Sequence, residues 1–183
     1  MVHYTIESGA SRFTIRVTAG GLLSALGHNP TFTMRDFGGD VAFDPDSPES
    51  SSLNMTIRAS ALQLQDDVSE KDRREIMRAT MDEVLETSKY PEIRYSCDDV
   101  RVRGSANGPL ELQLNGRLTL RGVTRAERIG ARIVVMGDVL RASGEFVLRQ
   151  THYGIRLVSI GGKMLHVKDE LRCAFDVVTR QRE

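Results

Sequence analysis

The chain has 183 residues, with 25 Lys+Arg against 25 Asp+Glu, which suits one domain of ordinary globular composition. The balanced charge argues against nucleic acid as a partner, because nucleic-acid binding needs a basic excess. Two Cys are too few for a disulfide scaffold, and no apolar run approaches the ~18–20 residues of a transmembrane segment.

Residues 1–7 enter an alternating pattern at once, without the basic region and apolar stretch of a secretory signal. We therefore expect a cytoplasmic protein in which Cys97 and Cys173 are reduced and buried. Whether a precursor segment was removed stays open. No linker or low-complexity tract divides the chain, so we expect residues 1–183 to form a single domain.

Apolar and polar residues alternate along most of the chain. In chain order, the clearest stretches are residues 12–18, 53–58, 93–97, 110–120 and 171–177. Such alternation is typical of antiparallel strands with one buried face, and residues that favour turns separate the stretches. About eight or nine strands with no repeating helices between them indicate a sandwich or a barrel, which periodicity alone does not distinguish.

One segment, residues 69–86, follows a helical period instead. Ser69 is followed three residues later by Asp72, as in a capping box, and a second start of this kind occurs at Thr80. The apolar residues at helical spacing are Ile76, Met77, Met81, Val84 and Leu85. We predict one helix or two short ones whose apolar stripe lies against the sheet or closes one end of a barrel. The mixed charges of residues 71–75 are typical of a solvated helix face.

The inward-facing residues are the candidate ligand contacts. A small closed sheet of about eight strands either fills with side chains or leaves room for one apolar ligand, and the pattern leaves both interpretations open. The candidates are Phe13, Ile15, Phe32, Met34, Phe43, Met55, Met77, Met81, Leu85, Tyr95, Phe146, Tyr153 and Phe175.

Signatures of catalysis are scarce. The sequence has no nucleophile elbow, phosphate-binding loop, zinc-protease motif or Cys-x-x-Cys motif. Both Cys fall at inward positions, where an apolar wall raises the pKa of a thiol. The four His, at positions 3, 28, 152 and 166, form no closely spaced pair of the kind typical of a metal site. We expect no catalytic residue, no metal and no cofactor.

Three residues are candidates for contact with a polar headgroup, by charge and turn position only. His28 lies in a turn after Gly27, and His152 lies near Arg149. For Arg149 we slightly favour the alternative that it is an outward strand residue paired with an acid.

Several motifs together resemble the YceI-like family, in the order in which that family has them. The two most distinctive are Lys89-Tyr90-Pro91-Glu92-Ile93-Arg94-Tyr95, similar to K-Y-P-x-I-x-F, and residues 114–124, similar to V-x-G-x-L-T-[IL]-x-G-V-T. Weaker matches are residues 37–45, 149–155 and 167–171. The resemblance runs from about Ser11 to Val178, and His152 departs from it by standing where the family usually has Asp.

This resemblance implies a lipocalin-like antiparallel β-barrel of about eight strands that binds polyisoprenoids. Our main hypothesis is a lipid-binding protein that holds a long-chain isoprenoid, quinone-type or fatty amphiphile in the barrel, with residues 69–86 as a lid. Two alternatives stay open: an enzyme on a lipid or isoprenoid substrate that uses His28 or His152, and a stress-related interaction protein with a filled barrel. A homodimer is also left open.

Overall fold

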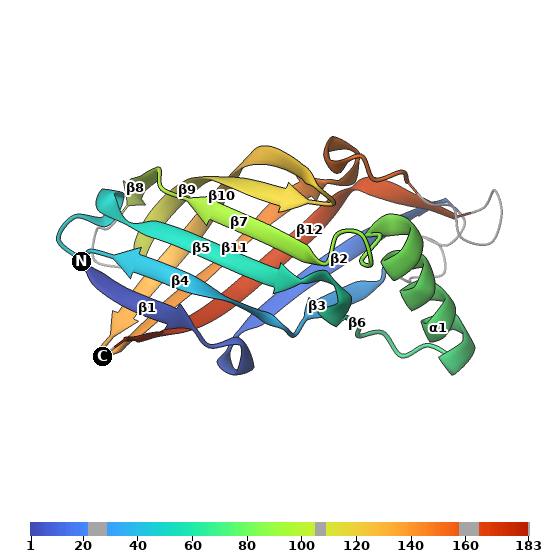
Figure 1. Cartoon of the computed structure of the whole chain (residues 1–183), viewed down its shortest axis with the longest axis horizontal. Coiled ribbons are helices and arrows are strands. Elements are labelled where there is room, and N and C mark those ends of the chain that lie inside the picture. The colour runs from blue at the N-terminus through green and yellow to red at the C-terminus, as the bar shows by residue number, and fades with distance from the viewer. Residues whose placement is uncertain (22–28, 105–108, 158–164, 183) are drawn as a thin grey trace.

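The computed structural model describes residues 1–21, 29–104, 109–157 and 165–182 (Figure 1). The strands are β1 (Val2–Ile6), β2 (Arg12–Gly21), β3 (Thr31–Met34), β4 (Phe37–Phe43), β5 (Ser52–Arg58), β6 (Leu62–Leu64), β7 (Glu92–Cys97), β8 (Val100–Gly104), β9 (Leu110–Leu120), β10 (Val123–Met136), β11 (Val139–Arg149) and β12 (Leu165–Gln181). The helical elements are α1 (Glu70–Arg78), a π-helical turn (Ala79–Val84) and the 3-10 turns Ser8–Ala10, Pro48–Ser50, Ala59–Ala61 and Gln150–Tyr153.

These strands form one sheet that closes on itself. Its order runs β1-β4-β5-β7-β9-β10-β11-β12, and β12 then pairs with β1, so eight antiparallel strands make a closed barrel. Strand β12 also pairs with β2, and the sheet continues from β2 through β3 to β6. This closure confirms the predicted antiparallel barrel and excludes the sandwich.

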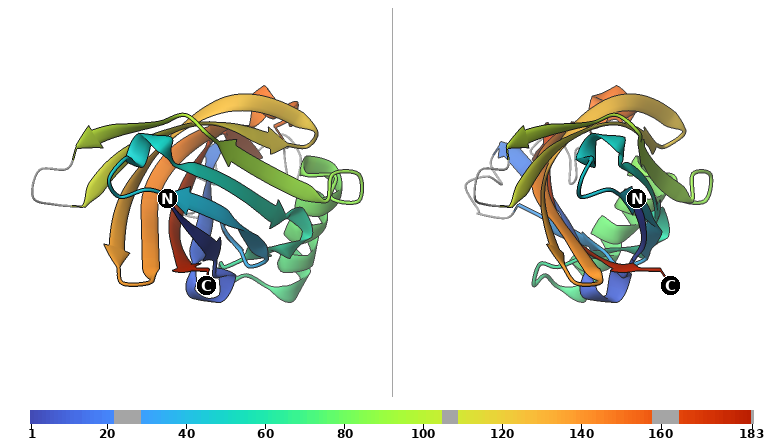
Figure 2. Two further views of the ribbon diagram at one scale, coloured as in Figure 1. Left: turned by 60° about the vertical axis from the view of Figure 1, so that its left-hand side comes forward. Right: turned by 90° about the vertical axis from the view of Figure 1, so that its left-hand side faces the viewer.

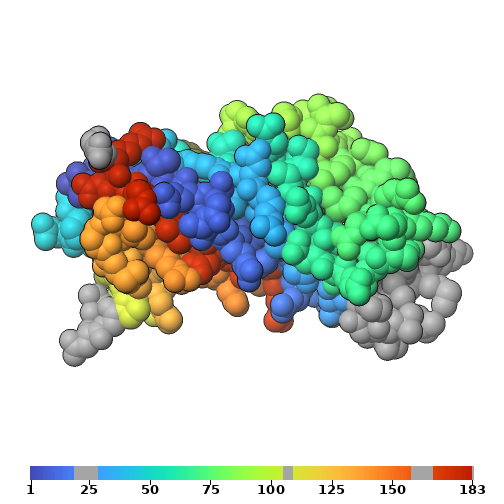
Figure 3. Space-filling model, turned by 90° about the horizontal axis from the view of Figure 1, so that it is seen from below, coloured from blue at the N-terminus to red at the C-terminus, as the bar shows by residue number. Residues whose placement is uncertain are grey.

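The wall of the barrel differs between its two ends because β12 is 17 residues long. Near its C-terminus, β12 pairs with β1 through Thr179–Gln181, whereas its earlier residues pair with β2. Both chain termini lie at one end of the barrel, which we call the terminal end. Helix α1 covers the opposite end, which we call the α1 end (Figure 1). Figure 2 shows the barrel from the end where the termini lie, and Figure 3 shows the surface that the helical segment forms at the other end.

Alternation along each strand sorts the side chains as the sequence predicts. In β7, for example, Ile93, Tyr95 and Cys97 are buried, and the residues between them are exposed. The buried side chains of the strands join into one apolar core inside the barrel, and the inward side chains of β2 pack against it. Burial of this apolar surface is the main force that holds the closed sheet together.

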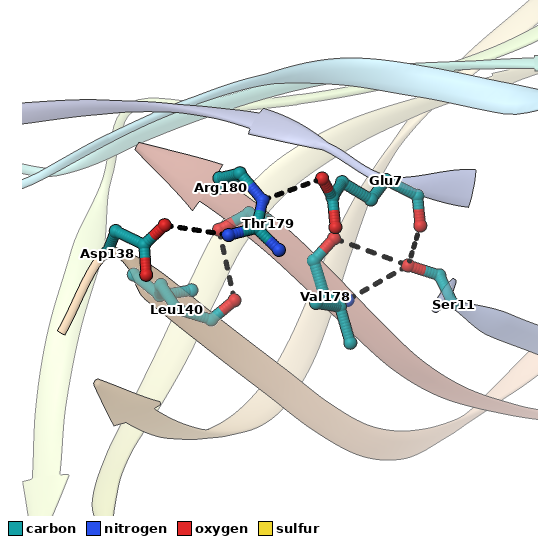
Figure 4. A network of polar contacts seen from close by, with 7 residues as sticks. All are labelled: Glu7, Ser11, Asp138, Leu140, Val178, Thr179 and Arg180. Carbon is teal, nitrogen blue, oxygen red and sulfur yellow. Dashed lines mark hydrogen bonds and ion pairs between the residues drawn. The ribbon is translucent and has the colours of Figure 1, made fainter. Parts of the chain in front are cut away.

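A group of polar contacts holds the last residues of β12 to their neighbours at the terminal end (Figure 4). The fully buried Thr179 donates from Oγ1 to the carbonyl of Leu140 at 3.0 Å. The guanidinium of Arg180 bridges Glu7 at 2.9 Å and Asp138 at 2.7 Å, which links the first strand to the β10–β11 hairpin. The buried bond contributes most, because exposed ion pairs contribute only about 0–1 kcal/mol each.

The helical segment begins as the sequence predicts. The backbone N–H of Asp72 donates to the Ser69 hydroxyl at 3.1 Å, which caps α1. One continuous helical segment follows, since the π-helical turn adjoins α1 directly. Arg73 then fixes the segment to the barrel, because its guanidinium donates to the carbonyls of Leu64 and Asp66 at 2.7 Å each.

Candidate functional site

The barrel contains a cavity of about 520 Å³ at the end that α1 covers. That volume lies within the usual range of small-molecule sites, about 300–1,000 Å³. Its wall comes from nearly all strands that reach this end, and its cover comes from the helical segment through Ile76, Ala79 and Val84. Most of the surrounding side chains are aliphatic or aromatic. The arrangement is therefore an apolar cavity covered by a helical segment.

On two strands the inner boundary of the cavity falls between successive inward residues. Along β12, Cys173 lines the cavity, whereas the next inward residue, Phe175, does not. Along β7, Ile93 lines it and Tyr95 does not. Tyr95 and Phe175, which we call the aromatic layer, thus mark the point at which the hollow end gives way to the packed end.

Two glycines make room for the aromatic layer. A Cβ at Gly116 would lie 2.4 Å from the Tyr95 ring, and one at Gly144 would lie 2.7 Å from the Phe175 ring. Each ring therefore occupies space that any larger residue would take. Phe13, the cross-strand partner of Phe175 on β2, lines the cavity and stacks its ring on that of Phe175 with centroids 6.4 Å apart.

A carboxylate–phenol pair joins Glu127, which is half-buried, to a fully buried tyrosine. Tyr153 is fully buried, and its hydroxyl donates to Oε1 of Glu127 at 2.7 Å. Burial first, and then the hydrogen bond to this carboxylate, raise the pKa of Tyr153. The hydroxyl of Tyr95 donates to the carbonyl of Leu114 at 3.3 Å, and burial likewise raises the pKa of Tyr95. Both phenols stay neutral and structural at physiological pH.

The structure separates the candidate ligand contacts into two groups. Those that line the cavity are Phe13, Ile15, Phe32, Met34, Leu85 and Phe146. Those that do not line it are Phe43, Met55, Met77, Met81, Tyr95, Tyr153 and Phe175. The second group packs in or against the core, so its contact with a ligand stays a prediction.

Several lining residues were not among the candidates. They include Leu118, Leu120, Leu148, Ile155, Leu171 and Gln150. Leu118, Leu120 and Leu171 share the alternation of their strands, so the same periodic signal that selected Phe13 also marks them. Gln150 has no such signal, because it lies in a 3-10 turn and is 6% exposed.

The headgroup candidates do not gather at the cavity. His28 lies outside the described residues. Arg149 pairs with Oε1 of Glu170 at 2.9 Å and is exposed, which matches the outward paired position considered above. His152 is also exposed, and its carbonyl accepts from Arg125 at 3.2 Å. A role for these residues in binding a headgroup stays a prediction.

Acidic residues occur at the cavity instead. Asp66, Asp72 and Glu75 line it, and Asp72 and Glu75 are exposed, so they lie at its rim. Both rim residues belong to the mixed-charge run that we predicted to be a plain solvated face. Among the lining residues that the structure describes, none is Lys, Arg or His.

The two thiols are unsuited to nucleophilic chemistry. Burial raises the pKa of Cys173 to about 12 and also raises the pKa of Cys97. Within the described ranges, no three His, Cys, Asp or Glu side chains are grouped closely enough to hold a metal ion. The helices of these ranges are all too short or too polar to cross a bilayer.

Comparisons with known proteins agree with this architecture. The family profile described as "YceI-like domain" matches residues 4–179. Protein YceI of Escherichia coli O157:H7 is 30% identical over 106 residues, which is 58% of this chain and 50% of that protein. The chain thus spans about half the length of the curated relatives it matches.

Two solved structures share the fold. BcnA of Burkholderia cenocepacia has a TM-score of 0.73 at 15% identity, over 94% of this chain and 98% of that chain. A polyisoprenoid binding domain from Saccharophagus degradans, implicated in plant cell wall breakdown, has a TM-score of 0.70 at 10% identity, over 100% of both chains.

Proposed function

Because this chain belongs to the YceI-like family, we propose that it binds a long-chain lipid whose tail occupies the cavity at the α1 end. The tail would be isoprenoid, quinone-type or fatty in character. The observation that carries this proposal is the apolar cavity of about 520 Å³ inside the barrel. The description of the Saccharophagus degradans domain as polyisoprenoid binding supports the same class of ligand.

The energetics of such a tail are favourable. Each CH₂ that leaves water contributes about 0.8 kcal/mol. A tail of about a dozen carbons that is buried over its whole length would therefore gain roughly 10 kcal/mol. Association commonly costs ~4–15 kcal/mol in lost freedom, so net binding requires that most of the tail be buried. Specificity for length would follow from the depth of the cavity, which the aromatic layer limits.

The helical segment, residues 69–86, is the proposed lid. Ile76, Ala79 and Val84 cover the cavity, and Arg73 holds the segment to two backbone carbonyls of the wall. Movement of this segment away from the wall would open a path for the tail. An interior with this much open space favours ligand binding over the filled-barrel hypothesis. The cytoplasmic location and the homodimer stay predictions.

The test is organic extraction of the purified protein with mass spectrometry, followed by displacement of the neutral fluorescent dye Nile red by long-chain lipids. A stoichiometric long-chain lipid, or saturable displacement, is the expected result. The proposal would be overturned if no lipid were extracted from the protein and no long-chain lipid displaced the dye from it.

A substitution pair locates the binding site. Leu118→Phe fills part of the cavity and should weaken the binding of long tails several-fold, whereas the volume-conserving Leu118→Met should leave it nearly unchanged. Equal binding by both variants would place the ligand elsewhere.

A further inference from the structure

The polar groups at the cavity carry hydrogen-bond acceptors almost to the exclusion of donors. Among the described residues, five side chains with nitrogen or oxygen atoms line it: Asp66, Asp72, Glu75, Thr80 and Gln150. The three carboxylates can only accept when ionised. The question is then which hydrogens the other two have left to donate.

Thr80 has none. Its single hydroxyl hydrogen is used in a bond to the carbonyl of Ile76 at 2.7 Å. Only the lone pairs of its oxygen remain for a ligand. Thr80 therefore adds a fourth acceptor to the three carboxylates.

Gln150 is the one exception, and it is limited. It is more than nine-tenths buried, and its Nε2 donates to the carbonyl of Lys168 at 3.0 Å. One amide hydrogen and the carboxamide oxygen remain. Among the described residues, no hydrogen bond to that oxygen is seen, so Gln150 can offer one acceptor as well as one donor.

Two arginines of the helical segment are engaged away from the cavity. Arg73 directs its guanidinium to the carbonyls of Leu64 and Asp66, and Arg78 pairs with Glu83 at 3.0 Å. Neither of the two arginines lines the cavity. None of the described residues that line the cavity is basic. A headgroup at the rim would therefore meet the negative charges of Asp72 and Glu75 directly.

We propose that the amphiphile carries a headgroup that donates hydrogen bonds and has no negative charge, namely a long-chain alcohol or amine. This inference rests on the proposed function and specifies its ligand class. A hydroxyl or ammonium group supplies hydrogens to the acceptors at the rim. A phosphate or carboxylate brings like charge toward Asp66, Asp72 and Glu75, and such repulsion is a common source of specificity.

A set of ligands with one tail and different heads tests the proposal. Displacement of Nile red would be measured with dodecanol, dodecylamine, dodecanoic acid and dodecyl phosphate at neutral pH. We expect the alcohol and the amine to bind about tenfold more tightly than the acid and the phosphate, or about 1.4 kcal/mol. The ratio of amine to alcohol then tells whether the preferred donor is charged or neutral.

The failures of the two proposals are distinguishable. Binding of all four compounds with equal affinity, or tighter binding of the phosphate, would overturn the headgroup inference alone. Binding of none of them would overturn the proposed function and the inference together.

A matched pair of variants isolates the charge at the rim. Glu75→Gln should narrow the preference for dodecylamine over dodecyl phosphate several-fold, because it removes one like charge. Glu83→Gln removes a carboxylate from the same helical segment that pairs with Arg78 and does not line the cavity, so the preference should be unchanged. An identical effect of both variants would contradict a role for the rim.

Discussion

The two ends of the barrel are built from the same strands and yet differ in what fills them. At the terminal end, side chains such as Tyr4, Phe43 and Leu140 are almost fully buried in the apolar core. At the α1 end, side chains such as Leu118 line an open chamber. Since inward residues of β7 and β9 alternate in the same way whether or not they line the cavity, the alternating pattern does not decide between a filled and a hollow interior.

The difference lies in how side-chain sizes combine across strands. At the boundary, the large rings of the aromatic layer lie against Gly116 and Gly144 of neighbouring strands. This pairing of large with absent side chains fills one level of the barrel. A cavity is therefore set by the register between strands, which brings particular sizes to one level, and not by any single strand.

The largest expected effect contrasts one leucine from each end. Leu140→Ala should lower the free energy of unfolding by about 3 kcal/mol, because it leaves a void in a packed core. Leu118→Ala should cost about 1 kcal/mol, since that side chain already borders open space and loses fewer contacts. Urea denaturation of both variants measures the difference. Equal losses would contradict the division into a packed end and a hollow end.

The next effect concerns the glycine beneath the aromatic layer. In Gly116→Ala, the new Cβ would lie 2.4 Å from the Tyr95 ring and 2.6 Å from the Ser96 carbonyl, which is backbone. We expect a loss of about 2 kcal/mol in thermal or urea unfolding. Gly130→Ala, on the adjacent strand β10, is the control, because its Cβ would meet nothing within 4 Å. If both variants were equally stable, the close fit would have no energetic consequence.

A smaller effect is expected at the carboxylate–phenol pair. Tyr153→Phe removes the donor to Glu127 and should cost about 1–2 kcal/mol, because the carboxylate is left without that bond. The double variant with Glu127→Gln should lose less than the sum of the two single variants. Additive losses in urea denaturation would indicate that the two side chains are not coupled.

The smallest effect distinguishes the ends by thiol chemistry. Cys173 lines the cavity, whereas Cys97 lies in the packed end with its Sγ 3.4 Å from the carbonyl of Asp99. A small uncharged thiol reagent should therefore modify Cys173 slowly and Cys97 more slowly still, and dodecanol should protect Cys173. Mass spectrometry of modified peptides follows both sites. Faster labelling of Cys97 would contradict the assignment of the cavity.

The raised thiol pKa also has a sign for stability. Because the folded pKa of Cys173 is about 12, above the unfolded value near 8.5, its contribution to stability is complete below that unfolded value. This contribution is lost as pH rises from about 8.5 toward 12. Replacement by Ala should flatten that part of the alkaline unfolding curve.

Much of the fold was predictable because its signals are local. Alternation within one strand indicates which face is buried, and Ser69 followed by Asp72 marks the start of α1. Closure through β1 and β12 joins the first and last strands of the chain, so no local pattern contains it. Periodicity alone did not distinguish a barrel from a sandwich, and the family resemblance predicted the barrel.

The cavity lining was harder to predict because it depends on small rotations. The apolar stripe of residues 69–86 contains the neighbours Ile76 and Met77. Of these two residues, Ile76 lines the cavity and Met77 does not. One residue is about a quarter of a helical turn, so the sequence does not resolve which of the two faces inward. Asp72 and Glu75 were predicted to be solvated, and they are, but the solvent they meet lies at the rim of a chamber.

The length of β12 has a consequence for the life of an empty protein. One strand serves as a wall of the chamber and, farther along, as part of the packed core that Thr179 and Leu140 complete. Because the packed end lies away from the cavity, we expect the closed sheet to stay folded whether or not the cavity holds a ligand. The proposed lipid-binding protein would then remain intact between the release of one ligand and the binding of the next.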